Sequence, residues 1–312
     1  MYYIGVDLGG TNIAAGVVNS NGEILRSGSV PTNVGRPYEE IIKDMADLVL
    51  GLIKDEGLTL DDIQSVGIGS PGAIKNGYCI FANNLGWRNV PLCDELRKYV
   101  KVPVYADNDA NVAALAEASF GAAKGYDNSV TITLGTGVGG GLYINGQLYG
   151  GSHGCGAELG HMCIEQGGIQ CSCGNKGCWE KYASATALID AGKTSINYAP
   201  DSLIAKAVEG DASKVTAKVI VDAAKAGDKA ALRIFNEYVE YIVMGLISIQ
   251  NIFDPDIIAI GGGVAKAGEF LLDAVKQRYE EQIFYKEIGY GKVVLAQMGN
   301  DAGIVGAAML TK

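Results

Sequence analysis

One short segment gathers the side chains best suited to bind a metal. Within eighteen residues it offers one imidazole and three thiols, and a carboxylate lies just beyond each end. The possible ligands are His161, Cys171, Cys173 and Cys178, and the flanking acids are Glu158 and Glu180. Three thiolates and one imidazole fill the tetrahedral shell of zinc and leave no position for water, so the sequence predicts a structural zinc ion. Such an ion would fix both acids and the histidine at the rim of a site.

Two other interpretations of these thiols remain open. They could form a disulfide, or they could be buried apolar residues, as free cysteines often are. Three of the seven cysteines fall within eight residues of a polar loop, which is unusual for residues that fill a core. The other four are scattered, and we expect each to be an ordinary buried residue. They are Cys79, Cys93, Cys155 and Cys163.

Two glycine-rich turns, 7–11 and 134–141, have the composition of phosphate-binding loops. Glycine lets the backbone approach a polyphosphate closely and direct amide hydrogens at it. Both turns lie between strand-like runs, which excludes a Rossmann or P-loop site, since those need a helix directly after the glycines. Asp7, at the end of an apolar strand, could hold magnesium through water. The alternative is that the glycines only make tight hairpins, but a third glycine run at 260–264 favours phosphate binding.

A polar pair marks the end of another predicted strand. Asn108 and Asp109 follow an apolar run and open a helix, so Asp109 is expected at the carboxyl end of a strand, where clefts form. It could equally serve as the N-cap of that helix. Asn83 and Asn84 stand close to Trp87, and amides suit sugar hydroxyls because each offers a donor and an acceptor.

The composition indicates a protein with enough hydrophobic residues to form cores and with a net negative charge. The chain has 312 residues, 48% of them hydrophobic, with 44 glycines and a formal net charge of −10. This charge argues against nucleic acid or an anionic membrane as the main partner. The chain opens on a strand-like run without a basic, signal-like region, and no apolar run is long enough to cross a membrane. We expect a cytoplasmic protein, where thiolates stay reduced.

The two glycine-rich turns belong to one repeated pattern. In both places the order is strand, glycine-rich turn, strand, Asn-Gly turn and strand, over 4–25 and again over 130–149. This repetition indicates two similar α/β domains. Hydrophobic spacing predicts helices at 39–54, 109–120, 229–252 and 303–310, and strands at 65–69, 102–106, 257–260 and 292–296. The likeliest junction between the domains is 121–128.

In order, the motifs Asp-Leu-Gly-Gly-Thr, Asn-Asp-Ala-Asn, Glu-Leu-Gly-His and Cys-x-Cys-x4-Cys resemble the ROK family of sugar kinases and sugar-responsive repressors. The resemblance runs from about residue 3 to residue 310. In detail, 84–87 and 154–161 look most like the glucokinases of Gram-positive type. The resemblance implies two ribonuclease-H-like domains of the actin/hexokinase/Hsp70 ATPase fold, with the zinc loop in the second. The first domain would comprise residues 1–120 together with about 300–312, and the second domain would comprise residues 121–299.

The resemblance also implies a role for each matching residue. Asp109 becomes the base that accepts the proton of the sugar 6-hydroxyl, and His161 uses one nitrogen for zinc and the other for sugar. The implied sugar-binding residues are Asn83, Asn108, Asp109, Glu158, His161 and Glu180. The implied ATP-binding residues are Asp7, Gly9, Gly10, Thr11, Asn12, Gly135, Thr136, Gly137, Gly261, Gly262 and Gly263. Asp7 would hold Mg²⁺ through water, and zinc would stay structural.

Several functions compete with a glucose kinase. Within the class, the sugar could be N-acetylmannosamine, fructose or allose, and the phosphoryl donor could be polyphosphate or ADP in place of ATP. A sugar-responsive repressor of the family carries a helix-turn-helix domain before the first glycine-rich turn, for which we expect no room here. An ATPase that assembles or folds other proteins would not need the Asn, Glu and His set. The family resemblance further implies a homodimer.

Overall fold

The computed structural model describes residues 1–310. The chain forms two compact units. Unit 1 contains Met1–Thr131, Gly141–Ala157 and the segment from Gln297 onward, and unit 2 contains Ile132–Gly140 and Glu158–Ala296. Both ends of the described chain therefore belong to unit 1.

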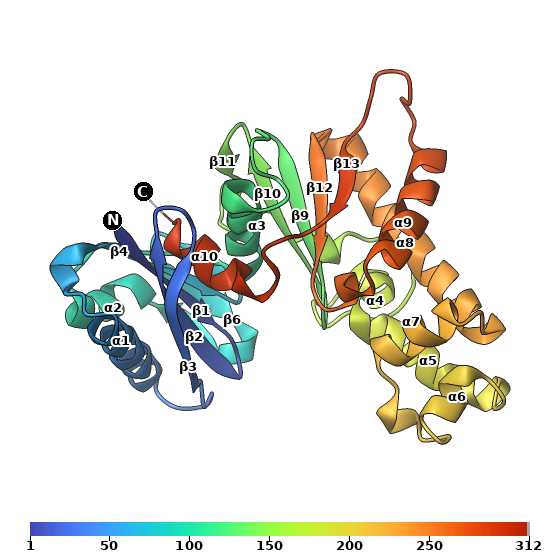
Figure 1. Ribbon diagram of the computed structural model, residues 1–312, viewed down its shortest axis with the longest axis horizontal. Coiled ribbons are helices and arrows are strands. Elements are labelled where there is room, and N and C mark those ends of the chain that lie inside the picture. The colour runs from blue at the N-terminus through green and yellow to red at the C-terminus, as the bar shows by residue number, and fades with distance from the viewer. Residues whose placement is uncertain (311–312) are drawn as a thin grey trace. The chain divides into compact units, whose positions relative to one another are not determined.

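The first sheet has the strand order β3-β2-β1-β4-β8 (Figure 1). Its strands are β1 (Tyr2–Leu8), β2 (Asn12–Asn19), β3 (Ile24–Pro31), β4 (Ile63–Ser70) and β8 (Val104–Asn108). β1, β4 and β8 run parallel, so their carboxyl ends meet at one edge. In the register, Asp7 lies opposite Gly69, and Gly69 lies opposite Asp107. The strands thus bring Asp7 and the start of the 109–120 helix to the same edge of one sheet.

Helices cover both faces of this sheet. α1 (Tyr38–Asp55) and α2 (Leu92–Val100) pack on one face, where Ile4, Val6 and Leu8 join them in a buried core. α3 (Asp109–Phe120) and α10 (Ala302–Ala308) pack together on the other face. On that face β1 and β4 carry the glycines Gly5 and Gly67 against α10. A methyl group at either position would lie 1.7 Å from a carbonyl oxygen of α10. Only glycine permits this contact between backbones.

The second five-stranded sheet repeats the order of the first, as β11-β10-β9-β12-β13. Its strands are β9 (Ser129–Leu134), β10 (Val138–Ile144), β11 (Gln147–Leu148), β12 (Ile257–Gly261) and β13 (Lys292–Leu295). In both sheets the first strand of the pattern is central, which confirms the predicted internal repeat. A small sheet of β5 (Ala73–Lys75), β6 (Tyr78–Ala82) and β7 (Trp87–Val90) belongs to unit 1. Its strands are not among those predicted, although Asn76-Gly77 makes a two-residue turn between β5 and β6.

The remaining α-helices lie in unit 2. They are α4 (Glu180–Ala183), α5 (Ala185–Tyr198), α6 (Leu203–Ala207), α7 (Ala217–Lys225), α8 (Lys229–Phe253) and α9 (Glu269–Gln282). The short 3-10 helices are η1 (Leu60–Asp62), η2 (Asn83–Leu85), η3 (Leu159–His161), η4 (Ala212–Lys214), η5 (Val264–Ala267) and η6 (Gly299–Asp301). Among residues 1–310, no helix combines the length and apolar character that a membrane span requires.

The predicted helices and strands are confirmed, with ends that differ by a few residues. Two details differ from expectation. Of the two Asn-Gly pairs in the repeated pattern, only Asn145-Gly146 forms the two-residue turn, with positive φ at Asn145 (52°) and Gly146 (74°). At the first, the Asn19 side chain accepts bonds from two later amides, and the turn is longer. The expectation that the scattered cysteines are buried is wrong for Cys155 and Cys163, which lie in exposed loops.

Candidate active site and metal centre

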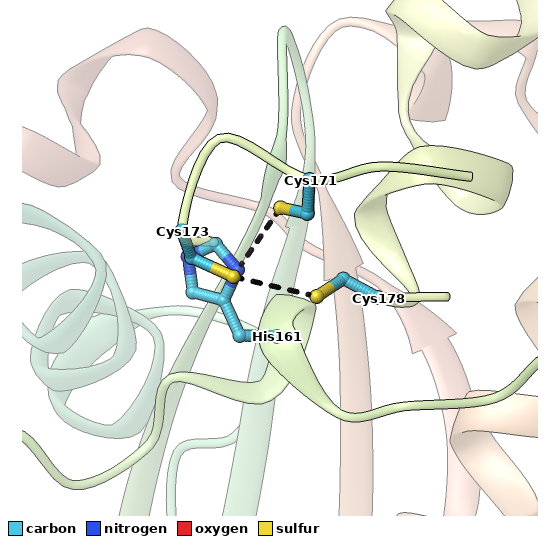
Figure 2. Close-up of side chains that lie close together, drawn as sticks. All are labelled: His161, Cys171, Cys173 and Cys178. Atoms are coloured by element: carbon cyan, nitrogen blue, oxygen red, sulfur yellow. Dashed lines mark hydrogen bonds between the residues drawn. The ribbon is translucent and has the colours of Figure 1, made fainter. Parts of the chain in front are cut away.

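The four predicted metal ligands lie together in unit 2 (Figure 2). Their donor atoms are all within 4.8 Å of one another. The Sγ atoms of Cys173 and Cys178 are 3.5 Å apart, and Cys171 Sγ lies 3.7 Å from Nδ1 of His161. Zinc bonds of about 2.3 Å to sulfur and about 2.1 Å to nitrogen give tetrahedral edges of roughly 3.6–3.8 Å. The donor types suit a zinc ion, and the two closest donor pairs lie near the edge lengths that it requires.

Two of the thiols in this cluster, Cys171 and Cys178, have raised pKa values and favour their protonated forms unless a cation compensates them. Desolvation, together with the neighbouring thiols of Cys173 and Cys171, raises the pKa of Cys178 to about 12. Desolvation also raises the pKa of Cys171. A backbone hydrogen bond from Asn175 lowers the pKa of Cys173. Three thiolates at this spacing need a metal to offset their mutual repulsion, so metal binding would release protons.

Backbone hydrogen bonds fold the loop that carries the thiols. Ile164 N donates to Gly177 O at 2.9 Å, Gly177 N donates to Ile169 O at 2.9 Å, and Cys171 N donates to Asn175 O at 2.8 Å. Gly177 has φ +78°, and a methyl group there would lie 1.7 Å from the Glu165 carbonyl oxygen. The loop can close only because this residue is glycine.

Glu180 joins the metal cluster to the second glycine-rich turn. Its Oε1 atom accepts a hydrogen bond from the Cys171 thiol at 3.1 Å and lies 4.0 Å from Nδ1 of His161. A methyl group at Gly137 would lie 2.6 Å from Glu180 Oε2. The preceding Trp179 is fully buried and donates from Nε1 to Tyr241 O at 2.7 Å, which anchors the start of α4. The carboxylate is therefore held between the cluster and the turn.

Asp109 is the first residue of α3, and its side chain is exposed. Asn108, and not Asp109, caps the helix: its Oδ1 accepts from Ala110 N at 2.8 Å and from Asn111 N at 3.4 Å. The Asn108 amide also donates to Gly72 O at 3.0 Å. Desolvation raises the pKa of Asp109, while the hydrogen bonds from Ala110 N and from the Asn108 side chain lower it. The arrangement presents an oriented carboxylate at the sheet edge.

Asp7 lies at the same edge, beside the first glycine-rich turn. Desolvation raises the pKa of Asp7, and the charge of Asp109 raises it further, so the two carboxylates interact. A methyl group at Gly303 would lie 2.5 Å from an Asp7 carboxylate oxygen, so the start of α10 also touches this group. Across the turn, Gly9 N donates to Asn12 O at 2.9 Å. Two nearby carboxylates of high pKa suit a site that receives a cation or a proton.

The second and third glycine runs lie against each other in unit 2. Gly262 has φ +86°, and a methyl group there would lie 2.6 Å from the backbone of Leu134, directly before the second turn. Within that turn, Gly135 N donates to Gly137 O at 3.0 Å. The carbonyl of Thr136 accepts from the Thr186 hydroxyl at 2.8 Å. These contacts fix the turn from the side of α5.

A cavity of about 420 Å³ adjoins the second turn. Thr136, Glu180 and Thr186 form part of its wall, and most of the rest comes from α5 and α8. None of the third run, Gly261, Gly262 or Gly263, lines it. The cavity therefore lies next to the predicted phosphate contact but apart from the predicted adenosine segment.

The predicted sugar-binding residues are distributed over both units. Asn83, Asn108 and Asp109 belong to unit 1, where Asn83 is exposed at the start of η2. Next to it, Asn84 lies 3.7 Å from the position that a methyl group on Gly10 would occupy. Glu158, His161 and Glu180 belong to unit 2, with Glu158 exposed directly before η3.

Sequence reasoning missed three residues around these sites. Asp107 accepts from Asn108 N at 2.6 Å and from the Asn111 amide at 2.8 Å, and desolvation raises its pKa. Thr32 is fully buried and bonds to the first glycine-rich turn. Glu117 is buried in α3 and accepts from the amides of Ala122 and Met298, both at 2.8 Å. Of these three, only Asp107 could have been predicted from the sequence, because it lies at the end of a predicted strand, directly before Asn108.

Comparisons with known proteins cover almost the whole chain. Residues 3–312 match the ROK family. The glucokinase of Thermotoga maritima is 40% identical over 99% of this chain and 96% of its own length. A ROK family glucokinase from Streptomyces griseus, solved in complex with glucose and AMPPNP, is 38% identical with a TM-score of 0.84, covering 99% of this chain and 98% of that one. The xylose repressor of Bacillus subtilis is 29% identical over 99% of this chain but only 76% of the repressor.

Proposed function

The chain belongs to the ROK family, and we propose that it is an ATP-dependent hexose kinase that converts glucose to glucose 6-phosphate. Full-length similarity to glucokinases at 37–40% identity supports this activity. So does the related Streptomyces griseus enzyme, which was solved with glucose and an ATP analogue. The single observation that carries the proposal is the Asp109 carboxylate, oriented at the edge where β1, β4 and β8 end.

In unit 1, Asp109 accepts the proton of the sugar 6-hydroxyl while the oxygen attacks the γ-phosphorus. The bond from that phosphorus to the bridging oxygen breaks, and ADP leaves. Phosphoryl transfer needs alignment and charge neutralisation more than covalent help from the protein, so one carboxylate suffices as base. Asn83 and Asn108 orient the sugar. Gly9, Gly10, Thr11 and Asn12 bind phosphate oxygens. Asp7 would hold Mg²⁺ through water, and that ion would neutralise charge on the transferring phosphoryl group.

In unit 2, Glu158, His161 and Glu180 hold the sugar hydroxyls. The His161 ring points Nδ1 at the thiols, so Nε2 is the nitrogen that would donate to the sugar. A structural zinc ion, held with Cys171, Cys173 and Cys178, would keep this ring in place. Deprotonation of Cys171 would free Glu180 Oε1 to accept from a hydroxyl instead. Gly135, Thr136 and Gly137 bind phosphates, and Gly261, Gly262 and Gly263 bind the adenosine.

A coupled assay of phosphorylation tests this function. We expect the highest kcat/KM for glucose among glucose, mannose, fructose, allose, N-acetylglucosamine and N-acetylmannosamine, and for ATP among ATP, ADP and polyphosphate. A higher value for N-acetylmannosamine, fructose or allose would reassign the substrate within the class. Absence of phosphorylation of every sugar by every donor would refute the kinase assignment. The homodimer is a proposal that rests on the family resemblance alone, and the cytoplasmic location is one that rests on the sequence-based expectations, chiefly the thiol chemistry.

A further inference from the structure

Thr32 fixes the first glycine-rich turn from the inside of unit 1. It follows β3, is fully buried, and contacts the turn with both its side chain and its backbone. The Thr32 hydroxyl donates to Gly9 O at 2.6 Å, and Thr32 N donates to Thr11 O at 2.9 Å. Two of the turn's carbonyl groups are therefore held by one residue that lies more than twenty positions away in the sequence.

These bonds determine where the amide hydrogens of the turn point. In a trans peptide the C=O and the N–H of one plane point in opposite directions. The Gly9 carbonyl and the Gly10 amide share such a plane, so a bond that holds Gly9 O toward Thr32 directs Gly10 N–H away from it. Within residues 1–310, the amides of Gly10 and Thr11 have no hydrogen-bond partner in the protein. Peptides between glycines rotate easily, so this plane needs an external anchor.

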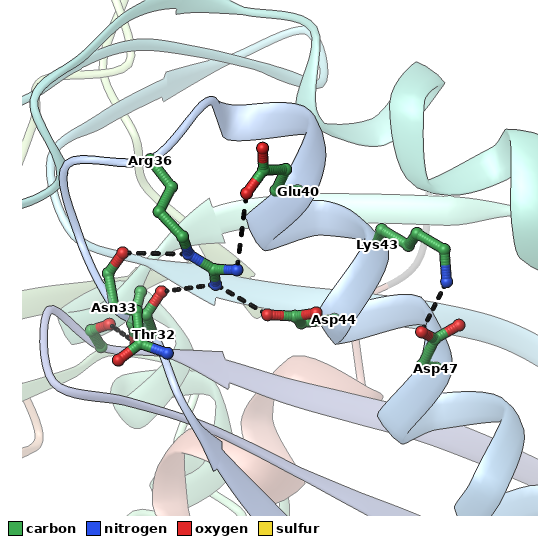
Figure 3. A network of polar contacts seen from close by, with 8 residues as sticks. Thr32, Asn33, Arg36, Glu40, Lys43, Asp44 and Asp47 are labelled. Atoms are coloured by element: carbon green, nitrogen blue, oxygen red, sulfur yellow. Dashed lines mark hydrogen bonds and ion pairs between the residues drawn. The ribbon is translucent and has the colours of Figure 1, made fainter.

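Arg36 in turn fixes Thr32 to α1 (Figure 3). Its Nη2 atom donates to Thr32 O at 3.1 Å and to Asp44 at 2.7 Å, and its Nε atom donates to Asn33 O at 3.2 Å. Asn33 has φ +49°, so the loop bends sharply at the point that Arg36 holds. The Arg36 and Asp44 side chains are 30% and 40% exposed. Ion pairs this exposed add little to global stability, so their effect is local.

We propose that Thr32 and Arg36 are positioning residues for the nucleotide, acting through the Gly9–Gly10 peptide of the first glycine-rich turn. This inference rests on the proposed kinase function. It does not make either residue a ligand of ATP. Loss of the Thr32 hydroxyl would let the Gly9–Gly10 peptide turn its N–H away from the phosphates, while the sugar-binding residues keep their places.

The test compares Thr32→Val, which keeps the branched shape without the hydroxyl, with Thr32→Ser, which keeps the hydroxyl. We expect Thr32→Val to raise the KM for ATP and the Kd of AMPPNP by about 3- to 10-fold, the effect of one hydrogen bond. The Kd of glucose should change by less than about two-fold. Thr32→Ser should restore the wild-type KM for ATP. Arg36→Met should raise it less than Thr32→Val, because Arg36 holds the turn only through Thr32.

Lys43→Ala is the matched control, because the exposed Lys43–Asp47 pair lies on the same helix without contact to Thr32 (Figure 3). It should leave the KM for ATP unchanged. An unchanged KM for ATP in Thr32→Val, or equal losses of ATP and glucose affinity, would overturn the inference. If Thr32→Val does not fold, Arg36→Met decides: a raised KM for ATP supports the proposal and an unchanged one refutes it. An inactive wild-type protein would instead refute the kinase function itself.

Discussion

Replacing Asp109 with asparagine should remove most turnover and leave the fold intact. Asparagine keeps an oxygen that can accept the 2.9 Å hydrogen bond from Ala110 N, so the start of α3 loses no acceptor. The helix cap also survives, because Asn108 provides it. Desolvation raises the pKa of Asp109, which means that its ionised form destabilises the folded state at neutral pH. We therefore expect the melting temperature of Asp109→Asn to equal or exceed that of the wild type.

The chemical loss should be much larger than any structural one. A positioned general base contributes typically about 10²–10⁴-fold to the rate, which corresponds to about 2.7–5.4 kcal/mol in the barrier. The assay measures kcat by coupled detection of the phosphorylated sugar, with the Kd of glucose from calorimetry. We expect a kcat lower by at least about 100-fold and a Kd within about three-fold of the wild-type value.

Asp107→Asn is the matched control for this experiment. Asp107 lies two residues away, and its pKa is raised by desolvation as well, but its Oδ1 atom already accepts from both Asn108 N and the Asn111 amide. Its replacement should lower kcat by less than about ten-fold. If Asp109→Asn kept more than half of the wild-type turnover, or if Asp107→Asn were the less active variant, Asp109 would not be the base.

Three further predictions concern the sugar site, the metal and pH. Glu158→Gln and Glu180→Gln should each weaken glucose binding by about 1.5–3 kcal/mol and ATP binding by less, and calorimetry showing unchanged glucose affinity in both would place them outside the site. The protein should contain about one zinc ion per chain. Chelation, or Cys173→Ser, should disorder residues 155–180 and lower the affinity for glucose more than the affinity for ATP. A metal-free protein with full glucose affinity would contradict this. Turnover should fall as the pH drops through the raised pKa of Asp109, which lies above the value of about 3.9 for an ordinary aspartate. If turnover instead stayed constant down to about pH 3.9, the raised pKa would not govern the reaction.

Local patterns predicted the elements that carry the chemistry. The apolar run before Asn108 and the helical spacing after it predicted a strand end and a helix start, and β8 and α3 meet there. The spacing of His161 and the three thiols predicted a metal cluster because all four ligands come from one loop. In each case the residues that interact are close in sequence, so their types and spacing are enough.

Contacts between distant residues could not be predicted in this way. Glu117 accepts a backbone hydrogen bond from Gln297 at 2.9 Å, and the two positions are 180 residues apart. A backbone amide offers the same hydrogen bond at every residue except proline, so no sequence pattern reveals its partner. The same holds for Thr32, whose hydroxyl meets a carbonyl of the first glycine-rich turn. The capping residue of α3 was also undecided, because both Asn108 and Asp109 suit an N-cap.

The packing of α10 has a consequence for the order in which the two units can fold during translation. The backbone of α10 lies on Gly5 and Gly67, and Gly303 touches the Asp7 carboxylate, yet these residues leave the ribosome after every residue of unit 2. Every residue of unit 2 has been synthesised by Ala296, so unit 2 can complete its packing while one face of the first sheet still lacks its cover. The surroundings of Asp7 are completed only after α10 has been synthesised. A chain terminated shortly after residue 296 would therefore keep a folded unit 2 without kinase activity.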